Sequence, residues 1–130
     1  MNNRTLAAAS LLTLLAGCAS TSNHEPPPVP PGAVTLNDGQ VRDTLVGKKF
    51  YGTTRMGYPY SLAFAADGTD VFSMSTEQPV AEKWTLNNGT VCLIMKDYPT
   101  ECSQVKMAEG AYWFVDPNTG KVNSWLRLNP

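Results

Sequence analysis

From Lys49 to the end of the chain, apolar and polar residues alternate in short runs separated by turn-forming residues. A period of two is the pattern of strands that bury one face. The runs predict eight strands, at residues 49–54, 60–65, 71–76, 81–86, 90–95, 103–108, 111–115 and 121–128. The turns between them contain Gly, Asn, Asp or Pro and recur about every eight to twelve residues, which indicates an antiparallel meander.

The same alternation assigns side chains to the two faces of the predicted sheet. The inward face is expected to hold Leu62, Phe64, Phe72, Met74, Trp84, Leu86, Val122, Leu126 and Leu128. This pattern predicts a mainly β fold, a small antiparallel up-and-down (lipocalin-like) barrel or curled meander of about eight strands. A two-sheet sandwich would show the same periodicity.

A helical pattern precedes the strands. Asn37 is a good N-cap, Gln40 stands where a capping box requires it, and Val41 and Leu45 lie on one face four residues apart. These residues predict one short N-terminal helix, over about 38–46, that closes one end of the domain.

The beginning of the chain carries an apolar run of a different kind. Residues 6–15 follow Arg4, have about the length of a signal-peptide core and are too short to span a bilayer. The run ends in Leu15-Ala16-Gly17-Cys18, which resembles the lipobox of bacterial lipoproteins. In that family the thiol receives diacylglycerol, the chain is cleaved before the Cys, and the new amine is acylated with a fatty acid such as palmitate. The resemblance implies a signal peptide at 1–17, cleavage between Gly17 and Cys18, and a membrane anchor on Cys18.

The segment after the lipobox, residues 18–33, is polar and then proline-rich. We expect it to be a tether, disordered to polyproline II, that reaches about 40 Å at about 3.1 Å per residue. A single β domain is expected over 34–130. Ala19 resembles the outer-membrane sorting signal of enterobacterial lipoproteins, which implies a lipid-anchored domain at the outer membrane that faces the periplasm.

The chain contains three cysteines. If Cys18 carries lipid, Cys92 and Cys102 remain as a pair in an oxidising compartment, where a disulfide is expected. To face each other across a hairpin they need an odd-numbered loop, roughly 95–99, and the bond would contribute about 2.5–3 kcal/mol on the chain-entropy model. Two reduced, buried cysteines are the alternative.

A second resemblance covers the domain. The stretch from Trp84 to Cys92, then Cys102 to Val105, Gly110 and the turn at 116–120, is similar to a group of exported bacterial domains of unknown function with a barrel-like sheet. It is more weakly similar to lipoprotein and secreted barrels that inhibit bacterial proteases, which also have a tryptophan strand leading into a disulfide cysteine. The first resemblance implies a fold, and the second implies an inhibitor.

Composition and charge limit the possible functions. The formal net charge of −1 provides no basic field for nucleic acid. The only histidine, His24, lies in the tether, away from any nucleophile or further metal ligand. The acids in or beside predicted turns are interpreted as solvated; they are Asp67, Asp70, Asp97, Glu101, Glu109 and Asp116. We therefore expect no catalytic residue, metal site or cofactor, and no nucleic-acid partner.

The tryptophans near the C-terminus suggest a contact surface. If Tyr112 and Leu126 face the core, alternation places Trp113 and Trp125 outward on neighbouring strands, where exposed tryptophans would mark a binding surface. If the sheet is covered on both sides, they are ordinary core. Tyr58 and Tyr60 form a second, weaker candidate.

Two functions are compatible with these patterns. The first is a non-catalytic module that binds another envelope or secreted protein, either in inhibition or immunity or as an accessory to envelope assembly. The alternative is a lipocalin-like carrier with a small hydrophobic ligand inside the barrel. The large inward side chains of Phe64, Phe72 and Trp84 favour a filled barrel. An apolar internal cavity would favour the carrier, and a solid core with exposed tryptophans would favour the module.

Overall fold

The structure, a computed structural model, describes Gly17 and residues 23–130. The remainder of the predicted signal peptide and the predicted anchor Cys18 lie outside the described residues. The described chain contains one helix and nine strands. In chain order they are β1 (Val34–Thr35), α1 (Asp38–Leu45), β2 (Lys49–Thr53), β3 (Pro59–Phe64), β4 (Thr69–Met74), β5 (Val80–Asn87), β6 (Thr90–Ile94), β7 (Glu101–Ala108), β8 (Ala111–Val115) and β9 (Val122–Arg127).

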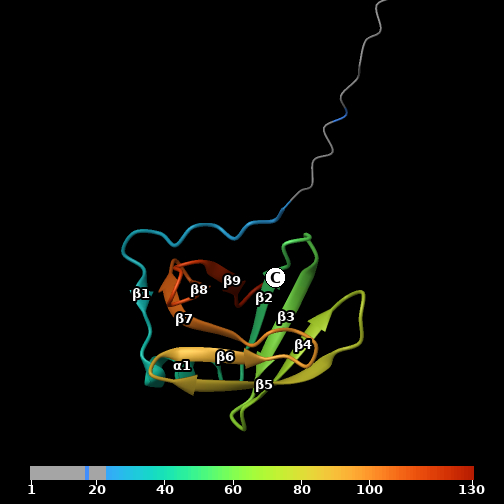
Figure 1. The fold of residues 1–130 in the computed structure, drawn as a ribbon. Helices are drawn as coiled ribbons and strands as arrows, with labels where there is room; N and C mark the ends of the chain where they lie inside the picture. The colour runs from blue at the N-terminus through green and yellow to red at the C-terminus, as the bar shows by residue number, and fades with distance from the viewer. Residues whose placement is uncertain (1–16, 18–22) are drawn as a thin grey trace, which may run out of the picture.

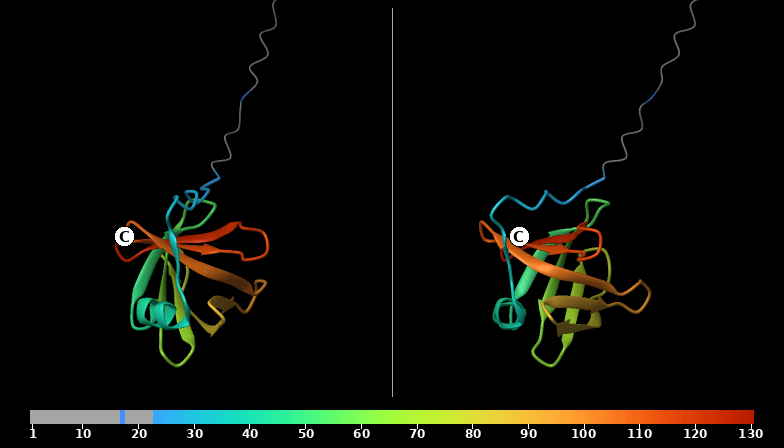
Figure 2. Two further views of the ribbon diagram at one scale, coloured as in Figure 1. Left: turned by 90° about the vertical axis from the view of Figure 1, so that its left-hand side faces the viewer. Right: turned by 60° about the vertical axis from the view of Figure 1, so that its left-hand side comes forward.

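Strands β2 to β9 form a closed antiparallel barrel (Figures 1 and 2). Each strand pairs with the next one in sequence, and the pair Tyr51–Arg127 joins β2 to β9 to close the sheet. The predicted barrel is confirmed, and the eight predicted strands agree with β2 to β9 to within two residues at each end. The unpredicted strand β1 pairs with β7 through Val34–Met107, beyond the part of β7 that pairs with β6.

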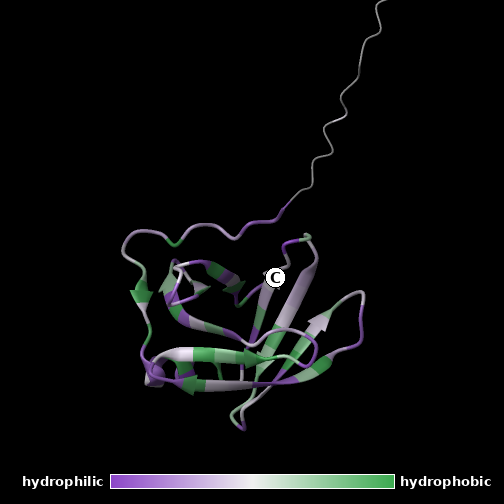
Figure 3. Cartoon of the chain, viewed as in Figure 1, coloured by the Kyte–Doolittle hydropathy of each residue, from purple (hydrophilic) through white to green (hydrophobic). Residues whose placement is uncertain are grey.

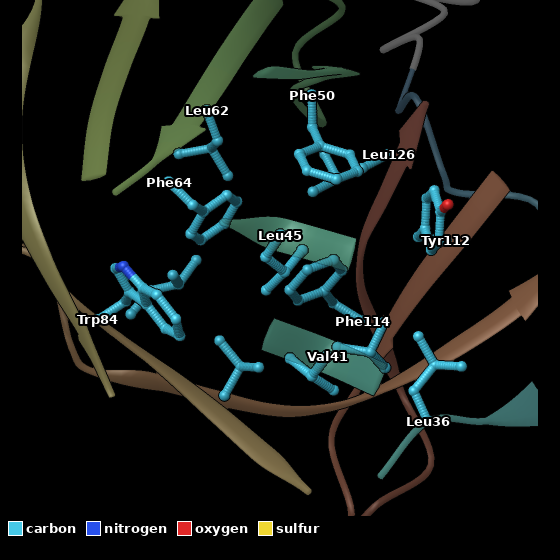
Figure 4. Close-up of a cluster of buried hydrophobic side chains, with 13 residues drawn as sticks. Leu36, Val41, Leu45, Phe50, Leu62, Phe64, Trp84, Tyr112, Phe114 and Leu126 are labelled. Atoms are coloured by element: carbon cyan, nitrogen blue, oxygen red, sulfur yellow. The ribbon is translucent and has the colours of Figure 1, made fainter. Parts of the chain in front are cut away.

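Helix α1 closes one end of the barrel. Asn37 and Gln40 form the predicted capping box, with each side chain accepting a hydrogen bond from the other residue's backbone N–H. Val41 and Leu45 are fully buried. In Figure 4 they point into the cluster of core side chains, where Leu45 lies beside Phe114. Two turns of helix are stable here because their apolar face is buried, not because of intrinsic propensity.

The core next to the helix is built from aromatic rings packed edge to face (Figure 4). The ring centroid of Phe50 lies 5.9 Å from that of Phe64 and 5.5 Å from that of Tyr112. The ring centroids of Phe64 and Trp84 are 5.7 Å apart. The indole N–H of Trp84 donates to two backbone carbonyls at 3.1 Å. This half of the barrel is solid, as the large inward side chains predicted.

Most of the predicted inward residues face the core, but two do not. Leu62, Phe64, Trp84 and Leu126 are buried, and Phe72 and Leu86 pack against them. Val122 faces outward because the β8–β9 register shifts between Phe114 and Val115, so that Asn123 is an extra residue and the alternation reverses. Leu128 follows the end of β9 and is exposed.

The predicted disulfide is present. Cys92 on β6 is directly opposite Cys102 on β7, with a Cα–Cα distance of 4.0 Å. The last pair before the hairpin loop is Leu93–Glu101, so the seven residues 94–100 connect the strands, an odd number as predicted. The bond lies on the outside of the sheet, because its neighbours Val91 and Leu93 point into the core.

Apolar and polar residues alternate along the strands (Figure 3). Within the described residues there is no helix of the length and apolar character needed to cross a bilayer.

Candidate functional site

A cavity of about 460 Å³ occupies the end of the barrel opposite α1. Its walls come from the ends of β2 and β6, the beginnings of β3 and β7, and from β4, β5 and β9. These segments meet where β2–β3, β4–β5 and β6–β7 are connected, so the cavity opens at that end of the barrel. The barrel is thus filled near the helix and hollow at the other end.

One wall of the cavity is apolar. Leu62, Phe72, Leu93 and Met95 line it, and the ring of Tyr60 packs on Phe72 with a centroid distance of 5.4 Å. Each of the strand residues is on the inward face that alternation assigns to it. The wall can therefore contact the apolar part of a ligand.

The place of Tyr60 depends on Gly52, the residue opposite it on β2. A Cβ atom at Gly52 would lie 2.7 Å from Cζ of Tyr60 and 2.9 Å from a methyl carbon of Leu126. The missing side chain leaves room for the phenol, which hydrogen-bonds with Ser124. Burial raises the pKa of Tyr60, so the phenol is neutral at physiological pH.

Two carboxyl groups lie inside the barrel beside this wall. Asp70 on β4 is directly opposite Glu82 on β5, and Glu82 lines the cavity. Asp70 is fully buried, and within the described residues its two carboxylate oxygens and Oε2 of Glu82 meet no donor group of another residue. These three buried oxygens can take part only in a hydrogen bond between the two carboxyl groups, which requires that one carboxyl is protonated.

Burial dominates the electrostatics of this pair. It raises the pKa of Asp70 to about 6. Burial and the adjacent charge of Asp70 raise the pKa of Glu82 to about 7. Two like charges in a poorly solvated site do not ionise together readily, so the pair retains a shared proton well above the ordinary pKa of either acid.

A third acid, Glu101, lines the cavity from the start of β7. Burial raises its pKa, and the nearby positive charges of Lys121 and Arg55 oppose that shift. The sequence interpretation of Asp70 and Glu101 as solvated turn acids is therefore wrong. The alternation contained the missing signal, since Asp70 and Glu82 each stand two residues before an inward aromatic, Phe72 and Trp84.

The proline-rich segment, residues 23–32, lies across this end of the molecule (Figures 1 and 2). The backbone N–H of His24 donates to the carbonyl of Arg55 at 2.8 Å, and residues 24–27 form part of the cavity wall. The predicted disordered tether is wrong for these residues. The predicted stalk histidine lies instead at the mouth of the cavity.

Trp113 and Trp125 explain why the segment is held. They lie outward on neighbouring strands as predicted, with ring centroids 6.2 Å apart, and the Arg127 guanidinium lies 4.8 Å over the ring of Trp125. The indole N–H of Trp113 donates to the carbonyl of Pro27 at 2.9 Å, and Val29 packs against the same cluster. Trp113 is only 4% exposed as a result, so the predicted exposed surface is wrong.

The second predicted surface is divided between two environments. Tyr58 lies in the β2–β3 turn and is 46% exposed, whereas Tyr60 points into the cavity. These two residues therefore do not form one contact surface.

Among the described residues no three His, Cys, Asp or Glu side chains are grouped so as to hold a metal ion. Comparison of the chain with protein-family models, with curated proteins and with solved structures finds no match in any of the three.

Proposed function

We propose that this chain is a lipid-anchored, non-catalytic barrel that binds a small amphipathic ligand in the cavity at its open end. The observation that carries the proposal is the cavity itself, about 460 Å³, at the end of the barrel opposite the half that is packed with aromatic core side chains. Ligand sites of small molecules are concave, largely apolar and roughly 300–1,000 Å³ in volume, with a few polar groups that orient the ligand. The apolar wall and the three carboxyl groups correspond to that description.

The alternative of a protein-binding module has less support. It relied on exposed tryptophans, and the chain's own proline-rich segment covers Trp113. A partner protein would first have to displace that segment. The carrier function needs no such rearrangement of the tryptophan face.

The anchor is part of the proposal. We propose that Cys18 is lipidated and that the domain is held at the periplasmic face of the outer membrane. Because residues 23–32 lie on the barrel, only the five peptide links from Cys18 to Asn23 separate the anchor from the domain, and five residues span at most about 18 Å. The open end of the barrel, where His24 lies, would then stay close to the bilayer. Incorporation of a fatty-acid analogue into the chain should be lost in Cys18→Ser, and persistent labelling would refute the anchor.

Ligand binding is tested with the chain from residue 18 onward carrying Cys18→Ser. Every helix, strand and core residue that the structure describes lies within residues 23–130, and this chain contains them all. The neutral fluorescent probe N-phenyl-1-naphthylamine is titrated into this protein and into two variants. Met95→Trp places an indole in the cavity mouth, and Ile94→Trp adds the same group at the preceding residue, which is 40% exposed on the outer face.

We expect saturable binding that Met95→Trp weakens by about tenfold or more, because the indole occupies ligand volume, while Ile94→Trp leaves it unchanged. Absence of saturable binding, or equal effects of the two substitutions, would refute the carrier function.

A further inference from the structure

We propose that the ligand carries a protonated amine on an apolar body and that the Asp70–Glu82 pair receives the ammonium group. This inference rests on the proposed function of the cavity, whose ligand class it defines. It depends on two features that occur together. One is a cavity with an apolar wall, which Glu82 lines, and the other is the fully buried carboxylate of Asp70, directly opposite Glu82, whose oxygens meet no other donor group within the described residues.

Among the residues that the structure describes, no basic group acts as a counter-ion to the pair. The pKa values of Asp70 and Glu82 are shifted by burial and by each carboxyl group's effect on the other, whereas Lys121 and Arg55 act to lower the pKa of Glu101. Of the other basic groups that line the cavity, Arg127 lies over the Trp125 ring on the outer face and His24 belongs to the covering segment. A positive charge brought by a ligand would therefore be the first to meet this pair.

An ammonium group satisfies this site better than the alternatives. It has three donors and no acceptor, so it can hydrogen-bond to carboxylate oxygens of Glu82 and Glu101 while its charge compensates the anionic pair. A neutral alcohol offers one donor and no charge. A carboxylate ligand would add a further negative charge to a poorly solvated site that already holds three acids. A bare metal ion has no group of three ligands to bind among the described residues.

The acid pair also indicates a role beyond folding. A buried pair of carboxyl groups without a cation lowers stability whenever both are ionised, so an apolar pair at the same two positions would make a more stable barrel. Strongly perturbed acids in a cavity are typical of functional sites. The cavity is where such a pair can meet a ligand.

The test compares three probes of the same chain length, octylamine, octanol and octanoate, by isothermal titration at pH 7.5. The protein is the chain described above, alone and with Glu82→Gln or Asp70→Asn. Both substitutions preserve the shape of the side chain and remove a buried charge, so folding is retained and is checked by circular dichroism. Glu77→Gln, in the exposed β4–β5 turn, removes one negative charge outside the cavity and is the matched control.

We expect octylamine to bind at least about tenfold more tightly than octanol, with octanoate weakest, because a charge-assisted hydrogen bond is about twice as strong as a neutral one. Glu82→Gln and Asp70→Asn should each reduce this preference, and Glu77→Gln should preserve it. Equal binding of octylamine and octanol, or a preference that survives both cavity substitutions, would overturn the ammonium assignment while the carrier function stands. Failure of all three probes, together with failure of the neutral fluorescent probe, would overturn both.

Discussion

Asp70→Asn should make the stability of this protein less dependent on pH, and the size of the effect follows from the burial of the acid pair. The carboxyl of Asp70 has an ordinary pKa of 3.8 in the unfolded chain and a pKa of about 6 in the folded protein. Because the folded-state pKa is raised, the folded protein holds a proton that the unfolded chain has already released. The stabilisation is therefore fully present below about pH 4 and is lost as the pH rises through about 6.

Each pKa unit corresponds to about 1.4 kcal/mol, so integration over the interval from pH 8 down to pH 4.5 gives a gain in the free energy of unfolding of about 2 kcal/mol from Asp70 alone. Glu82, whose pKa is raised to about 7, adds to the gain in the same direction. Asn cannot ionise and resembles the protonated acid in shape. The stability advantage of the variant over the natural chain should therefore be about 2 kcal/mol larger at pH 8 than at pH 4.5.

Urea unfolding followed by tryptophan fluorescence at the two pH values measures the difference. Asp67→Asn is the matched control of opposite sign, because hydrogen bonds from Thr69 lower the pKa of Asp67 in an exposed turn. Its folded-state pKa is depressed, so the natural carboxylate stabilises the protein at pH 8 and the Asn variant should be the less stable one there. If Asp70→Asn were no more stable than the natural chain at pH 8, the acid pair would not be buried as the structure places it.

Two further predictions concern the wall and the cover of the cavity. Gly52→Ala should lower the free energy of unfolding by about 1–3 kcal/mol, because its Cβ would overlap the Tyr60 ring. Gly39→Ala in α1 is the control and should raise the free energy of unfolding by up to about 1 kcal/mol. Urea unfolding of both variants checks this prediction, and equal effects would contradict it. Trp113→Phe should lose the hydrogen bond to the proline-rich segment and increase amide exchange at His24 by about fivefold. Trp125→Phe, whose buried indole N–H has no hydrogen-bond partner among the described residues, should leave exchange unchanged. Protection retained in Trp113→Phe would show that this bond does not hold the segment.

The barrel was predictable because its strands bury one face each. Alternation placed Leu62, Phe64 and Trp84 inward without knowledge of the tertiary structure, and Cys92 and Cys102 then had to be opposite each other in an odd-numbered hairpin. The same rule failed at Val122, because the extra residue Asn123 reverses the alternation between Val122 on one side of it and Leu126 on the other. A shift of that kind is not visible in a hydrophobic pattern.

The cavity and its cover were missed for two physical reasons. Acids beside a turn are usually solvated, and this general tendency conceals the period-two position of Asp70, which points inward. A proline-rich segment is expected to be solvated because it has little apolar surface to bury. Proline carbonyls still accept hydrogen bonds, and the Trp113 indole supplies a fixed donor on the barrel. Composition describes what a segment can bury with itself, and not what a neighbouring surface offers it.

The two outward tryptophans and the cavity belong to one arrangement. Pro27 accepts the hydrogen bond of Trp113 on the outer face of β8 and β9, and the same residue lines the cavity together with His24 and Pro26. Because one short segment contacts both places, the tryptophan face determines how the mouth of the barrel is covered. A substitution on the outside of the sheet that releases the segment should therefore change ligand affinity without touching any strand residue of the cavity. If the cavity binds a ligand as proposed, the tryptophans therefore act on it through the chain's own proline-rich segment.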